Sequence, residues 1–95
     1  MANQIPFYRL YLTERIRKHL GINLKNKKIY VFKVKNRTYL STDTIPKHAK
    51  FEILQVKLGT TQWFINIPET YLDYEPQTYK LLNTRGKVLE LVPSE

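Results

Sequence analysis

Apolar and polar side chains alternate in short runs along the chain, and turn-forming residues separate these runs. The runs are rich in Val, Ile, Tyr and Phe, which pack well on the faces of a sheet, so they predict strands. Two further segments have the spacing of short helices. The predicted strands cover 7–12, 29–34, 38–40, 51–58, 62–67, 79–82 and 87–92, and the predicted helices cover 14–20 and 69–74. The pattern predicts a mainly β fold with short helices.

The first predicted helix has a start signal, an apolar face and a stop signal. The hydroxyl of Thr13 can accept a hydrogen bond from an unpaired backbone N–H in the first turn. Ile16 and Leu20 are four residues apart and therefore lie on one face. Gly21 follows directly and suits the left-handed conformation that ends many helices. We therefore expect Ile16 and Leu20 to pack into the core.

The two halves of the chain show the same order of parts, which indicates an internal repeat. Each half has a strand that ends in an aliphatic residue, then a short helix, then a two-stranded hairpin. Residues 12–16 match 67–71, and the hairpin at 28–40 matches the hairpin at 79–91. A unit of about 45 residues rarely forms a stable core alone, so the two units are expected to share one.

A chain of 95 residues has the size of one small domain, which we expect to cover residues 1–95. Its net charge is +8, but the charge is unevenly distributed. Residues 1–50 contain twelve Lys and Arg against two acidic residues, whereas residues 51–95 contain four against six. The domain therefore divides into a basic half-unit at 7–41, a connection at 42–50 and a near-neutral half-unit at 51–93. The basic half is suited to a polyanion such as nucleic acid.

The basic half also resembles the AbrB-like, swapped-hairpin regulators. Ile16-Arg17 and Leu20-Gly21-Ile22 match the family spacing, and Leu12-Thr13 stands where Ile-Pro is usual. In the second half, Ile65 to Glu69 and Leu89 to Pro93 match the family strands. Two departures are that Asn26-Lys27 replaces the usual Gly-Asp and that the second half lacks Leu-Gly-Ile. The resemblance implies a small swapped-hairpin β-barrel of two interlocked half-units, which this chain could close within one molecule.

In that family, arginines on the strand and short helix contact DNA, and this role falls by position on Arg9, Arg15 and Arg17, and on Lys18. The guanidinium group can make two hydrogen bonds to phosphate or to a guanine edge. Lysines of the following loop and of the hairpin tip are expected to hold the phosphate backbone. The candidate DNA-binding residues are Arg9, Arg15, Arg17, Lys18, Lys25, Lys27, Lys28, Lys35 and Arg37. The alternative is a solvated surface that only maintains solubility.

Aromatic side chains could instead stack on the bases of single-stranded nucleic acid. Tyr8, Tyr11, Tyr30 and Phe32 alternate within predicted strands, however, so most are assigned to the core. This assignment favours double-stranded DNA as the partner.

Residues for catalysis or metal binding are not grouped in this sequence. The chain has no Cys, which excludes disulfides and thiol chemistry, and its two histidines, His19 and His48, are far apart and are expected to be exposed. Glu14 and Glu69 occupy matching repeat positions, but a helix N-terminus favours an acidic residue without any catalytic role. We expect no enzyme activity, no cofactor, no metal and no small-molecule substrate.

The sequence therefore predicts a double-stranded DNA-binding protein, most simply a transcriptional regulator that represses by occupying promoter DNA. A homodimer would lengthen its footprint. No apolar run has the length of a membrane span, so we expect a cytoplasmic, nucleoid-associated protein without membrane attachment. The alternative function is a protein-binding module, either an antitoxin or a small inhibitor of a nucleic-acid enzyme.

Overall fold

Strands make up most of the fold, which confirms the prediction of a mainly β protein. The computed structural model describes residues 7–72, 74, 76–83 and 86–93. Within these residues the elements are β1 (Phe7–Leu12), α1 (Glu14–Leu20), β2 (Lys28–Val34), β3 (Arg37–Ser41), β4 (Phe51–Gln55), β5 (Lys57–Leu58), β6 (Trp63–Pro68), the 3₁₀ turn η1 (Glu69–Tyr71), β7 (Pro76–Asn83) and β8 (Lys87–Pro93).

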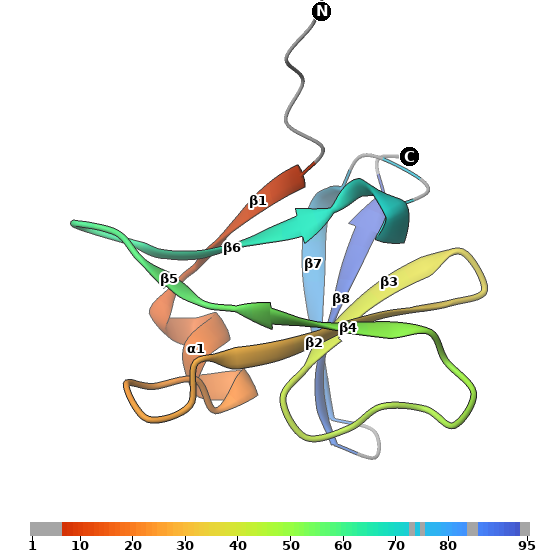
Figure 1. The fold of residues 1–95 in the computed structure, drawn as a ribbon, viewed down its shortest axis with the longest axis horizontal. Helices are drawn as coiled ribbons and strands as arrows, with labels where there is room; N and C mark the ends of the chain where they lie inside the picture. Colours follow the sequence, from red (N-terminus) through yellow and green to blue (C-terminus); the bar gives the residue numbers. More distant parts are fainter. Residues whose placement is uncertain (1–6, 73, 75, 84–85, 94–95) are drawn as a thin grey trace, which may run out of the picture.

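The strands form two antiparallel sheets (Figure 1). One sheet has three strands in the order β1-β6-β5, and the other has five in the order β4-β2-β3-β8-β7. The chain passes from β4 to β5 with only Val56 between them, so one extended segment contributes to both sheets. A strand that changes sheet in this way forms a corner between two packed sheets.

The closed barrel implied by the family resemblance is wrong for the described residues. The edge strands of the small sheet, β1 and β5, do not pair with those of the large sheet, β4 and β7. The two sheets are joined instead at Val56, which follows the end of the β2–β4 pair: its N–H donates to the Lys27 carbonyl at 2.7 Å, its side chain is buried, and the next residue, Lys57, pairs with β6. The extended segment turns at this point and leaves one sheet for the other, so the sheets pack face to face. The swapped-hairpin family itself stays a prediction.

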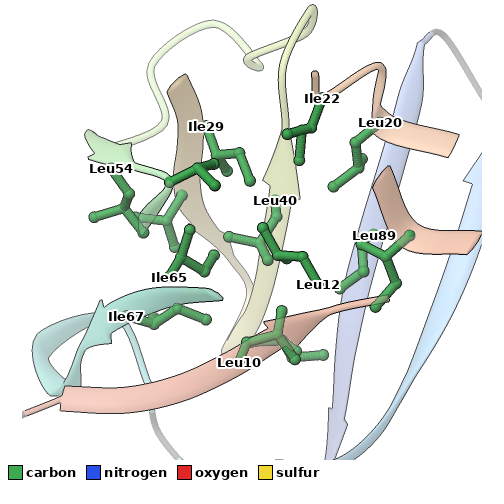
Figure 2. Packing of buried hydrophobic residues seen from close by; sticks show 14 of the residues in the cluster. Leu10, Leu12, Leu20, Ile22, Ile29, Leu40, Leu54, Ile65, Ile67 and Leu89 are labelled. Atoms are coloured by element: carbon green, nitrogen blue, oxygen red, sulfur yellow. The ribbon is translucent and has the colours of Figure 1, made fainter. Parts of the chain in front are cut away.

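The core lies between the two sheets and is closed at one end by α1 (Figure 2). Leu10 and Leu12 from β1 face Ile29 and Leu40 of the large sheet. Ile16 and Leu20 of α1 are each only 1% exposed, which confirms that this helix face packs into the core. The remaining buried members of the cluster are Ile22, Val31, Leu54, Val56, Ile65, Ile67, Tyr71, Leu89 and Leu91.

The strand register relates the two halves in a specific way. The repeat that matches residues 12 and 67 makes Leu10 equivalent to Ile65, and these two lie directly opposite each other in the β1–β6 pair. The hairpin match likewise makes Tyr39 equivalent to Glu90, and these lie opposite each other in the β3–β8 pair. An approximate twofold axis between two repeats places equivalent residues opposite each other in this way. The pairing therefore supports an internal repeat even though its sequence identity is low.

Both predicted signals of α1 are confirmed. Thr13 Oγ1 accepts a hydrogen bond from the Ile16 N–H at 3.3 Å, and Gly21 is in the left-handed conformation with a φ of 75°. His19, predicted to be exposed, is half-buried, because its Nε2 lies 3.0 Å from the Leu82 carbonyl and 3.2 Å from that of Val88. Carbonyl oxygens only accept, so Nε2 carries the hydrogen and attaches α1 to the β7–β8 hairpin.

The predicted helix at 69–74 is shorter than expected. A single 3₁₀ turn ends at Tyr71, and Tyr74 then donates its hydroxyl to the Leu91 carbonyl at 2.5 Å. The Tyr71 carbonyl accepts from the buried hydroxyl of Thr38. Burial is the main cause that raises the pKa of Tyr71 above its usual value, with a smaller contribution from Glu52. These contacts hold the second half-unit against β3 in place of a longer helix.

Candidate nucleic-acid interface

An open groove of about 580 Å³ lies beside α1 and gathers several of the predicted DNA-binding residues. We call it the cationic groove. Three cations line it: Arg17 and Lys18 from α1, and Lys25 from the loop that follows. Trp63 of β6 forms an aromatic part of its wall. The lining residues are Glu14, Arg17, Lys18, Ile22, Asn23, Leu24, Lys25 and Trp63. Glu14 is the single carboxylate among them.

Arg17 is held by the protein itself. Its Nη1 donates to the Leu12 carbonyl at 2.9 Å, and its guanidinium lies 4.8 Å from the centre of the Trp63 ring. A hydrogen bond from a charged donor and a cation–π contact both stabilise the fold. Arg17 therefore joins β1, α1 and β6, while its charge still contributes to the cationic groove.

Arg17→Ala is expected to lower the free energy of unfolding by about 1–3 kcal/mol, because both contacts are lost. Urea unfolding followed by circular dichroism measures this change. Arg15→Ala is the matched control, because Arg15 is exposed on the same helix, and its effect is expected to stay within about 0.5 kcal/mol. Equal stability of the two variants would contradict the structural role of Arg17.

Arg15 and Lys18 are the exposed cations of α1. Arg15 is exposed and has no ion-pair partner within the described residues. Lys18 Nζ lies 3.8 Å from a Glu14 carboxylate oxygen, with the two side chains 79% and 74% exposed. Such an exposed pair one helical turn apart contributes only about 0.3–0.5 kcal/mol. A phosphate group can therefore replace Glu14 as the partner of Lys18.

Asparagine hydrogen bonds fix the loop that carries Lys25. Asn23 Oδ1 accepts from the backbone N–H groups of Lys25 at 2.8 Å and Asn26 at 3.0 Å. Asn26 Nδ2 in turn donates to the Gly21 carbonyl at 3.1 Å. The buried Ile22 anchors the start of the loop in the core. Asn26, one of the departures from the family pattern, thus presents Lys25 on a rigid tip.

Lys27 and Lys28 continue the basic run from this loop into β2. Lys28 is exposed at the start of the strand, opposite Gln55 of β4, and Lys27 is half-buried just before it. Neither lines the cationic groove, but both follow the loop that does. Arg15, Lys18, Lys25, Lys27 and Lys28 therefore lie on α1 and the chain that follows it.

The two predicted residues of the hairpin tip are separate from this group. Lys35 and Asn36 have φ values of 49° and 66° and form the two-residue turn between β2 and β3. β2 places this turn about 20 Å from Lys28, at the opposite end of the molecule from α1 (Figure 1). Arg37 Nη1 lies 3.2 Å from Glu90 Oε2, so its charge is already paired. Lys35 and Arg37, predicted to contact DNA, therefore lie apart from the residues that line the cationic groove.

Burial and Glu90 also act on a neighbouring tyrosine at this end. Tyr39 lies opposite Glu90 in the β3–β8 pair, and burial, then Glu90, raise the pKa of its hydroxyl above the usual value. A carboxylate in this position disfavours a phosphate. The β2–β3 hairpin tip is thus a poorer anion surface than the groove.

Arg9 lies on a third surface, the outer face of the three-stranded sheet. Its Nε lies 3.3 Å from Asn66 Oδ1, and its guanidinium lies 4.1 Å from the centre of the Phe64 ring. Tyr11 shares this face and is 47% exposed, so the assignment of Tyr11 to the core is wrong. The sequence contained the signal, because Leu10 and Leu12 fill the inner positions of β1 and leave the odd-numbered positions outside.

Comparison with known proteins gives no match: no family model, curated protein or solved structure is significantly similar to this chain. The AbrB-like resemblance therefore has no further support from relatives. Within the described residues, no three His, Asp or Glu side chains are grouped so that they could hold a metal ion. Among the same residues, no helix has the length and hydropathy needed to cross a bilayer.

Proposed function

We propose that this protein binds double-stranded DNA through the cationic groove and the basic residues beside it, and that it regulates transcription by occupying promoter DNA. The observation that carries the proposal is the grouping of Lys18 and Lys25 around one open groove, with Arg15 exposed on the same helix. Phosphate contacts supply most of the affinity of such proteins for DNA. Side chains on a rigid loop and a capped helix can make them with little loss of entropy.

Each cation has a distinct role in this proposal. Arg15 is the one free guanidinium on α1 within the described residues, so it is the residue suited to a two-bond contact with phosphate or guanine. Lys18, Lys25, Lys27 and Lys28 act as point charges that hold the phosphate backbone and set the register. Arg17 keeps the groove in shape and adds charge. The duplex site does not include Arg9, which lies on the outer face of the three-stranded sheet. It also does not include Lys35 and Arg37, which lie at the β2–β3 hairpin tip.

The protein-binding alternative draws on a different surface. The edge strand β4 exposes Phe51 and Ile53, which are 47% and 52% exposed. An unpaired edge with apolar side chains can add a strand from another chain. A second copy bound there would form the homodimer expected from the sequence and lengthen the DNA footprint. Sedimentation of the protein with and without duplex DNA separates dimer formation from binding of another protein.

The salt dependence of duplex binding tests the proposal. Because five cations lie on α1 and the chain that follows it, log K is expected to fall with log salt concentration with a slope of about −4 to −5. Fluorescence anisotropy of a labelled duplex, measured from low to moderate salt, gives this slope. Promoter fragments from the source genome are expected to bind more tightly than random duplex. A slope near zero, or no binding at low salt, would contradict DNA binding.

A further inference from the structure

The outer face of the three-stranded sheet presents aromatic rings and cations to solvent. Phe7 and Tyr11 of β1 are 45% and 47% exposed, and half-buried Phe64 of β6 lies opposite Tyr11 on the same face. Arg9 and Lys57 supply positive charge on the same face, since Lys57 is opposite Phe64. We call this set of residues the aromatic platform: Phe7, Arg9, Tyr11, Lys57, Phe64 and Asn66.

From these contacts we infer that the aromatic platform binds single-stranded nucleic acid by stacking its unpaired bases. Stacking on aromatic side chains is tolerant of sequence because every base has a flat π face. Phe7 and Tyr11 are four residues apart on β1, which is about 13 Å along an extended strand, so they present two separate rings on one face. The inference is independent of duplex binding, because no platform residue lines the cationic groove.

Arg9 is arranged to hold a phosphate beside the stacked bases. Its guanidinium carbon lies 4.1 Å from the centre of the Phe64 ring, and Asn66 takes only the Nε hydrogen, so both terminal nitrogens are left without an acceptor within the described residues. Tyr11 and Phe64 meet edge to face, with ring centres 6.1 Å apart, and the Tyr11 side chain is still 47% exposed. The platform thus combines two exposed aromatic side chains, Phe7 and Tyr11, with a guanidinium that can donate to phosphate.

Charge favours a polyanion over a protein segment as the occupant. The strands β1, β5 and β6, all described in full, contain Arg9 and Lys57 and no Asp or Glu. The exposed aromatic pair on the other sheet differs in this respect. Tyr30 and Phe51 also meet edge to face, at 5.7 Å, but the outer face of their sheet includes Glu90 and more aliphatic side chains such as Ile53.

The test measures binding of fluorescein-labelled oligothymidylate of about 12 nucleotides by anisotropy. Tyr11→Ala is expected to weaken binding about 5- to 100-fold. Phe51→Ala is the matched control, since Phe51 is also 47% exposed and also packs edge to face, and it is expected to change affinity less than about twofold. Arg9→Lys keeps the charge but loses the planar guanidinium and its two-bond contact with phosphate, so it is also expected to weaken binding several-fold.

Circular dichroism and thermal unfolding establish that the variants fold; if Tyr11→Ala does not fold, Phe7→Ala at the far end of β1 takes its place. Native affinity of the folded platform variant, or an equal loss in Phe51→Ala, would overturn the inference. So would a stable dimer that dissociates in Tyr11→Ala and does not bind the oligonucleotide. Duplex binding is expected to be unchanged in Tyr11→Ala, so failure of one site is distinguishable from failure of the other.

Discussion

Replacing Arg15, Lys18 and Lys25 together by glutamine is expected to weaken duplex binding about 100-fold at near-physiological salt. Each phosphate contact contributes about 0.9 to the salt slope, so the slope is expected to become less steep by about 2.7. Glutamine keeps most of each side-chain stem, and the three side chains are exposed, so the fold should be retained. Anisotropy of a labelled duplex over a salt series measures both quantities.

The matched control removes the same three charges elsewhere. Lys35, Lys47 and Lys50 are all exposed, and none of them lines the cationic groove. Replacing these three by glutamine gives the same net charge of the whole chain. Affinity is expected to fall less than about fivefold, through long-range electrostatics that salt screens. An equal loss in both triple variants would mean that net charge, not the groove, determines binding.

Ile65→Ala is expected to lower the free energy of unfolding by about 2–5 kcal/mol, a large part of the total for a domain of this size. Ile65 is fully buried at the centre of the core, directly opposite Leu10. The loss combines the transfer free energy of the removed atoms with the cost of the cavity that remains. Urea unfolding followed by circular dichroism measures the change.

Ile53→Ala is the control for this second variant, because it makes the same chemical change at a position that is 52% exposed on β4. Its effect is expected to stay below about 1 kcal/mol, since no closed cavity forms there. A similar loss in Ile53→Ala would indicate that β4 is covered in solution, as a dimer through its edge would require. A small loss in Ile65→Ala would contradict the packing of the two sheets.

Local signals in the sequence predicted local structure well. The hydroxyl of Thr13, the pair Ile16 and Leu20, and Gly21 define α1, because capping, helical periodicity and positive φ are properties of a few neighbouring residues. The relation between sheets depends instead on contacts distant in sequence. The β4–β5 segment leaves the large sheet just after the hydrogen bond from Val56 to Lys27 and joins β6 of the small sheet, and no local pattern indicates this change. The closed barrel was predicted wrongly for this reason.

The candidate site divides in the same way. Charge asymmetry directed attention to α1 and the loop after it, because the net charge of a segment is a sum over its residues and can be read without knowing the fold. Which cations are free depends on tertiary contacts that the sequence does not show. Arg17 is held by Leu12 and Trp63, and Arg37 is paired with Glu90 across two strands. The solvent-facing position of Tyr11 was predictable from alternation once the aliphatic face of β1 was assigned to the core.

The most direct test of the central claim is the fluorescence of Trp63 during titration with unlabelled duplex DNA. Trp63 is the only tryptophan in the chain, and its ring lies in the wall of the cationic groove under Arg17. The account predicts that Trp63 emission changes in step with the duplex anisotropy signal, and that the Arg15, Lys18 and Lys25 triple variant shifts both curves together. Tight duplex binding that leaves Trp63 emission unchanged would place the DNA on another surface.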